Sequence, residues 1–288
     1  MQLIQQRKGL NIIRTSLNWL AGVLIFTPAV AIVGVLFIYP FFHSMLVSFQ
    51  NKENQWTFDN YIEVWHLYSQ DFFYTVWICF VSLVFLLFLT IMLAGYLRIY
   101  QNRFIEFLFK VPLFVPFVVV GHAVRVFLAP HGTLNSALVF LTSGLYNPDS
   151  FPSLAFTTTG LIFALLWKNI GLALLLVIGA FRGVNNSYLE AASNFSAGAF
   201  RQIWDILVPM SRKAIGVVAV LIFTSMMGCF SIPAMMGNGG GHQVLMMDLY
   251  YEIDYQHNAG AANAIGVLSY LVSIGAAIYY LKAVAHHD

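Results

Sequence analysis

Charged side chains are scarce in this sequence. Lysine, arginine, aspartate and glutamate together make up 9% of its 288 residues, against roughly 25% in soluble globular proteins. Hydrophobic residues make up 59% and aromatic residues 16%. Because a soluble fold needs more polar surface than this, the composition excludes a soluble domain and predicts an integral membrane protein.

Several functional classes lack the residues that they require. Fourteen basic residues nearly balance twelve acidic ones, which leaves no basic face for nucleic acid. Cys79 and Cys229 lie far apart in apolar runs, which predicts buried thiols rather than a disulfide or a zinc site. Apart from His286-His287, the histidines have no metal-ligand spacing. The sequence therefore predicts no metal site.

Catalytic and nucleotide-binding motifs are also missing. The chain has no Gly-x4-Gly-Lys-Ser/Thr, no His-Glu-x-x-His and no Gly-x-Ser-x-Gly. The glycine-rich segment 237–241 follows an apolar stretch, which predicts a flexible turn rather than a phosphate-binding loop. These absences argue against a membrane enzyme and predict that the chain itself binds no cofactor.

Long uncharged intervals indicate the membrane spans. Residues 15–51, 72–97, 214–247 and 255–281 carry no charge, and each interval exceeds the roughly 20 residues that a helix needs to cross a bilayer. Two further apolar stretches are interrupted only by Arg125 and Lys168. We expect an all-α protein with six transmembrane helices, at 17–46, 72–97, 109–130, 154–180, 214–236 and 260–282. The expected organisation is an N-terminal segment 1–16, a transmembrane domain 17–283 and a tail 284–288.

The distribution of basic residues predicts the orientation. Positive charge is enriched in cytoplasmic segments. With the N-terminus in the cytoplasm, inner segments hold all basic residues except Lys52, Arg125 and Lys168, so both termini are predicted to be cytoplasmic. The outer loops are then 47–71, 131–153 and 237–259, and the apolar piece 134–145 of the second predicts a short interfacial helix. No carboxylate lies within the predicted spans, which argues against a proton-driven carrier.

The inner connection 182–213 has the most informative pattern. Ser187-x-x-Glu190 is a capping box, which predicts a helix beginning at Tyr188. Gly198 predicts a bend. A second, amphipathic helix is expected before Pro209, with one apolar face formed by Phe200, Ile203, Trp204 and Leu207. Such a helix pair either docks on a partner protein or lies on the membrane surface.

This connection resembles the EAA loop of permease subunits of ATP-binding-cassette (ABC) importers. Glu190-Ala191-Ala192 opens the pattern, and Ile206 and Pro209 follow at the family's spacing. The family glycine falls on Ser196, and we expect Gly198 to replace its flexibility. Further similarity lies at Pro40, Ser48-Phe49, Asn60-Tyr61 and 231–237, the last resembling spermidine/putrescine, ferric-iron, thiamine and phosphonate permeases; sugar permeases are more distant.

The resemblance implies a type I importer architecture in the bacterial inner membrane. It implies that the EAA loop is a coupling helix that docks on an ATPase. The expected partners are two ATPase subunits, which bind ATP and magnesium, a second permease subunit, identical or homologous, and an external binding protein. The docking surface would comprise Glu190, Ala191, Ala192, Ser196 and Gly198, with Ile206 and Pro209 in the conserved spacing of the motif.

Polar residues within the predicted spans suggest a solute pathway. Arg125 with His122, and Lys168 with Asn169, are the candidates, because a charge inside the bilayer faces the bundle interior or water. They favour an anionic solute such as a phosphonate or phosphate ester; the alternative is a structural pair with backbone carbonyls. Polyamine, ferric iron, thiamine and sugar stay open as solutes, as does a secondary transporter without an ATPase.

Overall fold

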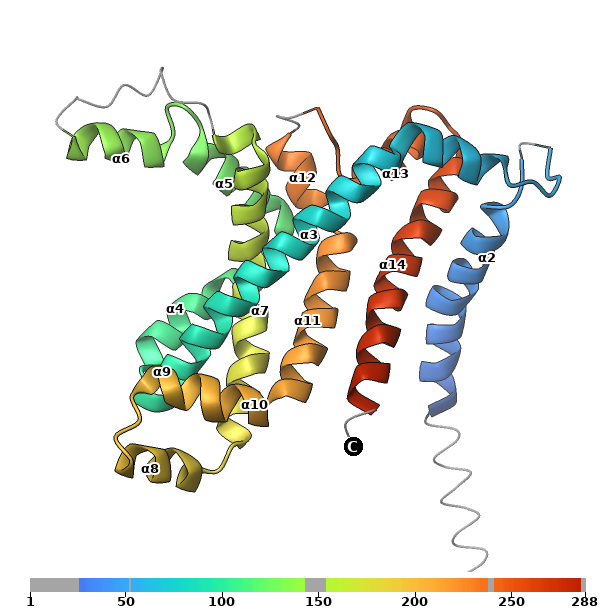
Figure 1. Ribbon diagram of the computed structural model, residues 1–288. Coiled ribbons are helices and arrows are strands. Elements are labelled where there is room, and N and C mark those ends of the chain that lie inside the picture. Colours follow the sequence, from blue (N-terminus) through green and yellow to red (C-terminus); the bar gives the residue numbers. More distant parts are fainter. Residues whose placement is uncertain (1–25, 52, 143–153, 238–240, 286–288) are drawn as a thin grey trace, which may run out of the picture.

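The computed structural model describes residues 26–51, 53–142, 154–237 and 241–285, and these residues are almost entirely helical (Figure 1). A single isolated bridge pairs Gln50 with Trp56. The elements are a helix from Phe26 to Val47 that contains η1 (Gly34–Ile38) and α2 (Tyr39–Val47), α3 (Asp59–Tyr100), α4 (Arg103–Phe114), α5 (Phe117–Leu128), α6 (Thr133–Leu141), η3 (Leu154–Phe156), α7 (Thr158–Gly183), α8 (Asn186–Asn194), α9 (Ala199–Arg201), η4 (Gln202–Leu207), α10 (Val208–Met210), α11 (Arg212–Met227), α12 (Ser231–Met236), α13 (Leu245–Asp254) and α14 (Ala259–Ala285).

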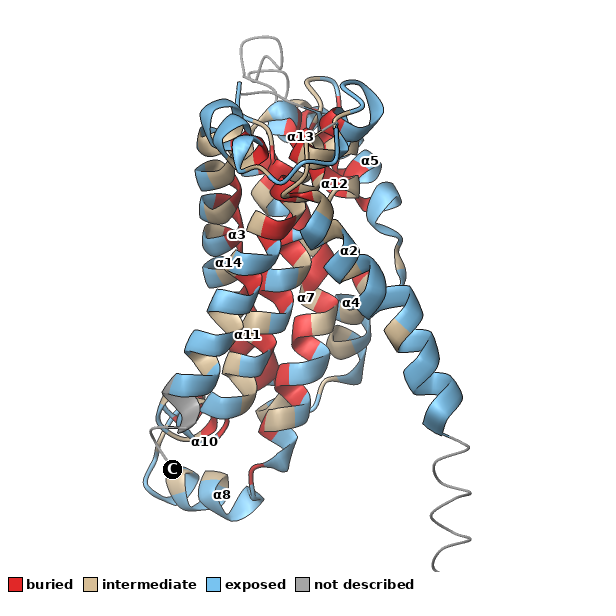
Figure 2. Cartoon of the chain, turned by 90° about the vertical axis from the view of Figure 1, so that its right-hand side faces the viewer, coloured by how far each residue is buried: buried red, intermediate tan, exposed pale blue. Residues whose placement is uncertain are grey.

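The core lies between the long helices α3, α7 and α11. Leu86, Leu174 and Ile222 are fully buried there, and Figure 2 shows the buried positions running along the middle of the bundle. The segment Phe26–Val47 has an apolar window with no buried residue and contacts the bundle mainly through α14. An apolar outer surface of this extent suits a lipid environment, because lipid replaces water as the solvent.

Five helices of the described part are long and apolar enough to cross a membrane, and a sixth span results if one bent pair is counted. This agrees with the six spans predicted from the uncharged intervals. Two of the predicted spans are interrupted. The span expected at 109–130 is divided at Val115-Pro116 into α4 and α5, and the span expected at 214–236 is divided at 228–230 into α11 and α12. The first break follows from chemistry, because Pro112 and Pro116 lack amide donors and disfavour a continuous helix.

The predicted outer loops contain more helix than the sequence suggested. The prediction of a loop over 47–71 is wrong for residues 59–71, because α3 begins at Asp59 and continues without interruption to Tyr100. Asn60 fixes this start by donating its amide to the carbonyls of Ser48 and Gln50, at 2.9 Å each. Hydropathy cannot detect such an extension, since charged residues are compatible with a helix outside the hydrocarbon. The expected third loop, 237–259, likewise contains α13.

Two ends of the bundle are distinguishable in Figure 1. One end carries α6, α12 and α13, and the other carries α8, α9 and α10 together with the start of the helix that contains α2 and the end of α14. The short helix predicted at 134–145 is present as α6, which runs across its end of the bundle. The segment 1–16, the histidine pair and residues 143–145 lie outside the described residues. The bundle thus separates α8 from the opposite loops by its full length.

Candidate functional site

The helix that carries Glu190 protrudes from the end of the bundle. It begins at Asn186 and has Asn185 as its N-cap, whose side-chain oxygen accepts from the Ser187 amide at 3.0 Å. The predicted capping box and the start at Tyr188 are therefore wrong, because an asparagine two residues upstream is an equally good cap. No residue of α8 is buried, and Glu190 and Ala191 are exposed on it.

The turn after α8 contains the loop's unusual backbone conformation. Ser196 has φ of +59°, in the left-handed region, whereas Gly198 has φ of −66° and caps α9 in an extended conformation. The expectation that Gly198 replaces the missing glycine is wrong, because Ser196 itself adopts the conformation that favours glycine. Its neighbour Phe195 is 88% exposed, which leaves an aromatic ring at the tip of the loop.

The second helix of the loop runs from Ala199 to Met210 through the π-helical turn η4. Ile203 and Leu207 are buried, as the amphipathic pattern predicted, whereas Phe200 is exposed. Pro209 does not end this helix. The chain bends by 80° after Met210 to enter α11. The buried residues fix one face of the helix against the bundle, and the remaining face continues the surface of α8.

A buried amide connects the two helices of the loop. The Gln202 side chain donates to Ser193 Oγ at 3.1 Å and to the Ala197 carbonyl at 2.9 Å. Ser193 Oγ in turn donates to the Leu189 carbonyl. These bonds hold the turn closed without help from a partner. Gln202 was not predicted from sequence, because its position on an otherwise apolar helix gives no indication of its contacts.

Arg98, at the end of α3, attaches the loop to the transmembrane helices. Its Nε donates to the Phe181 carbonyl and its Nη2 to the Val184 carbonyl, each at 2.9 Å, and Nη2 also donates to Asn186 Oδ1. The guanidinium thus satisfies the carbonyls at the end of α7 and holds the first residue of α8. Arg98 therefore joins α8 to both α3 and α7.

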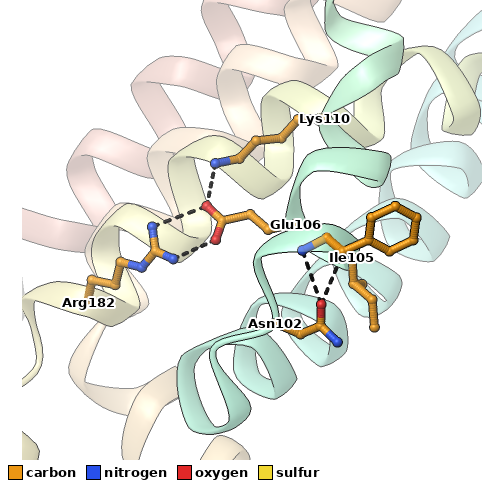
Figure 3. Close-up of polar contacts among 6 residues, drawn as sticks. Asn102, Ile105, Glu106, Lys110 and Arg182 are labelled. Atoms are coloured by element: carbon orange, nitrogen blue, oxygen red, sulfur yellow. Dashed lines mark hydrogen bonds and ion pairs between the residues drawn. The ribbon is translucent and has the colours of Figure 1, made fainter.

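The same end contains an ionic cluster between α4 and α7, in which the side chains of Glu106, Lys110 and Arg182 point toward one another (Figure 3). Arg182 donates to both oxygens of Glu106, at 3.2 and 2.6 Å, and Lys110 donates at 2.6 Å. The hydrogen bonds from Arg182, and then those from Lys110, hold the pKa of the Glu106 carboxyl below its ordinary value. The carboxylate therefore stays charged at neutral pH.

Lys168 and Asn169 of the predicted pathway lie inside the bundle. Lys168 is 8% exposed and its Nζ donates to the carbonyls of Pro112 at 3.1 Å, Leu113 at 3.4 Å and Val115 at 2.6 Å. These carbonyls lie at the break between α4 and α5, where helical amide donors are missing. Asn169 donates to the Leu165 carbonyl, one turn earlier in its own helix. These contacts match the structural alternative given for Lys168.

Arg125 and His122 lie on α5, and both are exposed. Arg125 donates to the Met235 carbonyl of α12 at 3.2 Å, and its guanidinium lies 5.1 Å from the centre of the Phe156 ring. The close approach of α5 to α12 depends on Gly121, since a Cβ there would lie 2.8 Å from that of Met235. The structure therefore brings Lys168 and Asn169 together on α7 and places Arg125 and His122 on a different helix.

A hydroxyl-lined cavity of about 350 Å³ lies between α2, α11, α13 and α14. More than half of its lining residues are apolar or glycine, among them Met227, Leu249 and Ile253. Its polar lining consists of Ser44, Thr224, Asn263, Ser269, Tyr270 and Ser273, and it includes no charged side chain. Ser44 donates to Asn263 Oδ1, whereas the buried Ser269 hydroxyl has no partner in the described part of the chain. Sequence reasoning missed this cavity, because single serines in apolar helices are common and their convergence is a tertiary property. No group of three or more potential metal ligands occurs among the described residues.

Comparison with known proteins identifies the family. Residues 87–283 match the family described as "Binding-protein-dependent transport system inner membrane component". The chain belongs to this family. The match covers the loop with Glu190 and confirms the predicted resemblance to permeases of binding-protein-dependent importers, and with the apolar helices it makes the chain a multi-pass inner membrane protein.

Two curated relatives show how far the similarity extends. The diacetylchitobiose uptake permease DasB of Streptomyces coelicolor is 25% identical over 93% of this chain and 88% of its own length. The molybdenum transport permease ModB of Azotobacter vinelandii is 29% identical over 44% of this chain. The match spans about half of the length of ModB. It spans slightly less than half of the length of the sulfoquinovosyl glycerol permease of Agrobacterium fabrum.

A solved structure supports the fold. A chain of a bacterial alginate ABC transporter, crystallised with an alginate-bound periplasmic protein, superimposes with a TM-score of 0.73 at 17% identity and covers 92% of this chain and 93% of its own. This similarity confirms the predicted importer permease architecture.

Proposed function

We propose that this chain is the permease subunit of an ATP-driven importer and is coupled to a separate ATPase through α8. The observation that carries the proposal is an exposed helix with no buried residue, fixed to the transmembrane bundle by Arg98. Two ATPase subunits, binding ATP and magnesium, would each receive one such helix. A second permease subunit, identical or homologous, would complete the pathway, and an external protein would deliver the solute.

The docking surface consists of α8 and the following turn. Glu190 supplies a charge, and Ala191 and Ala192 allow close approach by a partner. Ser196 and Gly198 set the turn, Ile206 is half-buried and Pro209 exposed on the second helix. ATP-driven closure of the ATPases would move α8, and the bonds of Arg98 would transmit that movement to α3 and α7. The permease is thus the two-state element whose equilibrium the nucleotide shifts.

The hydroxyl-lined cavity favours a polyhydroxylated solute. Its side chains offer hydrogen-bond donors and acceptors without charge, which is the chemistry that binds sugar hydroxyls. The relatives include permeases for diacetylchitobiose and sulfoquinovosyl glycerol. A phosphonate or phosphate ester, the leading expectation from sequence, gains no support from the named relatives. The two cations on which that expectation depended, buried Lys168 and exposed Arg125, both bind backbone carbonyls.

Charge reversal at Glu190 tests the coupling. Glu190→Lys should abolish solute uptake while the chain remains in the membrane, because the exposed position tolerates lysine but the docking surface does not. Uptake into cells and the amount of ATPase recovered with the chain are the measurements. Asp205→Lys, also exposed on this loop but on the helix packed against the bundle, is the matched control. Normal uptake with Glu190→Lys, or equal loss with the control, would contradict docking through α8.

Filling the cavity tests the solute assignment. Ser269→Leu should strongly reduce sugar uptake without reducing recovery of the ATPase, because leucine occupies the space that the hydroxyl lines. Tyr279→Leu, on the exposed side of the same helix, should leave uptake unchanged. Uptake that is unaffected by Ser269→Leu would exclude this cavity from the pathway, and a binding protein specific for an oxyanion would overturn the polyhydroxylated class.

A further inference from the structure

A second cavity, of about 640 Å³, opens between the end of α3, the start of α4 and the end of α7. The helix ends that line it lie at the end of the bundle that carries α8 (Figure 1). Its volume is within the roughly 300–1,000 Å³ of typical ligand sites. It is separate from the hydroxyl-lined cavity and shares no lining residue with it.

The lining of this cavity is strongly basic. Its charged residues are Arg98, Arg103, Lys110 and Arg182, together with one carboxylate, that of Glu106. Even after Glu106 is paired, the lining keeps an excess of three positive charges, and like charges repel one another. An anion in the cavity would remove that repulsion.

Arg103 is the cation that most clearly lacks a counter-ion. It is exposed, and it has no hydrogen-bond or ion-pair partner within the described ranges. It is the first residue of α4, where the helix dipole disfavours a cation. The Phe104 and Ile105 amides at this helix end already donate to the Asn102 side chain, so the group of the lining that is left to bind an anion is the Arg103 guanidinium.

Exposed apolar surface adjoins this charge. Phe107 lines the cavity and is itself exposed, as are its helix neighbours Phe104, Leu108 and Val111. The polar residues of α4, Glu106 and Lys110, lie on the cavity side. A ligand that satisfies both surfaces must carry an anionic group next to hydrocarbon.

We propose that this cavity binds the phosphate headgroup of an anionic phospholipid of the cytoplasmic leaflet. Arg103 and Lys110 contact the phosphate, and the acyl chains lie along Phe107 and the outer face of α4. Basic pockets between helices on the cytoplasmic side are suited to such headgroups, and phosphate accepts charge-assisted hydrogen bonds from arginine and lysine.

Occupancy of the cavity bears on the coupling loop. Arg98 and Arg182 line the cavity, and both hold the end of α7, which leads directly into α8. A bound headgroup would restrain this junction. This consequence depends on the proposed function, whereas lipid binding itself does not.

Lipid retention tests the site without a transport assay. The full chain, purified in mild detergent with its accompanying subunits, is incubated with vesicles of neutral phosphatidylcholine containing phosphatidylglycerol, and the phosphatidylglycerol retained after detergent exchange is measured by mass spectrometry. Two variants are measured: the single variant Arg103→Gln, and the double variant that adds Lys110→Gln. The control is Arg212→Gln, because Arg212 is an exposed arginine at the same end of the bundle but outside the cavity.

Retention should fall roughly fivefold for each cavity cation removed and should be unchanged in Arg212→Gln. Because Arg103 has no partner to lose, its single variant keeps the test free of folding defects. Equal retention by all variants would overturn the site. Displacement of the lipid by millimolar inorganic phosphate would overturn the lipid source and assign the cavity to a soluble phosphate.

Discussion

At the scale of single residues, a carboxyl group is buried beneath the loops opposite α8. Asp248 of α13 is 3% exposed, and one of its oxygens has no hydrogen-bond partner among the described residues. Helix α13 is not among the candidate spans. Burial, and then the charges of Asp71 and Glu252, raise the pKa of Asp248 to about 7. The folded state therefore favours the protonated form.

This shift predicts a pH dependence. Because the folded pKa lies above the ordinary value of 3.8, the contribution of Asp248 to stability is greatest below about pH 4 and falls until about pH 7. Asp248→Asn should remove this dependence and stabilise the fold by up to about 4 kcal/mol above pH 7. Thermal unfolding of the purified chain from pH 4 to 8 measures it. Asp254→Asn, an exposed carboxylate on the same helix, should keep the parent's slope.

Ser196 illustrates what a motif predicts at this scale. The family pattern marks its position as glycine, and the left-handed φ there shows why a glycine suits the turn. Because serine replaces this glycine, we expected Gly198 to supply the flexible position of the turn. The left-handed backbone conformation is nevertheless found at Ser196. A local pattern therefore predicted the conformation better than the residue type did.

At the scale of helices, the contact between α3 and η4 depends on Gly95. A Cβ there would lie 2.4 Å from Ile203 Cγ1. At that distance the two atoms clash, so Ile203 or the backbone would have to shift. Gly95→Val should therefore displace the second loop helix and reduce uptake severely, since overpacking costs about 1–3 kcal/mol. Uptake and the protease sensitivity of the loop are the measurements.

A second substitution distinguishes this contact from a general folding defect. Adding Ile203→Ala to Gly95→Val restores space and should recover much of the uptake. Gly179→Val, on α7 with open space around its Cα, should have little effect. Failure of Ile203→Ala to rescue would show that Gly95 acts through something other than the loop.

Element boundaries show how far the sequence is predictive. Uncharged intervals gave the number of spans, because the hydrocarbon sets the length of an apolar helix. They could not give the breaks at Val115 and 228–230, since the hydropathy is the same on both sides. Lys168, conspicuous as a charge, binds the carbonyls that the first break exposes. The contacts of Arg98 and the pair Arg182–Glu106 join residues 76–88 positions apart, and no local pattern reports these.

At the scale of the whole molecule, the proposed coupling requires one exposed helix to act on the whole bundle. Helix α8 has no buried residue, so it can move only what is bonded to it. Its bonds lead through Asn186 to Arg98, which joins α3 and α7, the pair with the most extensive packing in the bundle, and through Ser193 to Gln202 of the second loop helix. The opposite end, with α12 and α13, is reached along α3 and α7. Of the two connections, Arg98 is the one that leads directly from α8 to the long transmembrane helices, and ATP-driven movement would enter the transmembrane part through it.

Removal of this joint should separate ATP hydrolysis from transport. Arg98→Ala leaves α8 able to dock but loses three hydrogen bonds to α7 and α8, each worth about 1.5–3 kcal/mol when the donor is charged. In the reconstituted importer, ATP hydrolysis should persist while solute uptake falls about tenfold or more. Arg98→Lys keeps the charge without the forked geometry and should be intermediate, and Arg212→Ala, exposed at the same end, should match the parent. A parallel loss of hydrolysis and uptake in Arg98→Ala would mean that Arg98 supports docking of the ATPase rather than transmission of its movement.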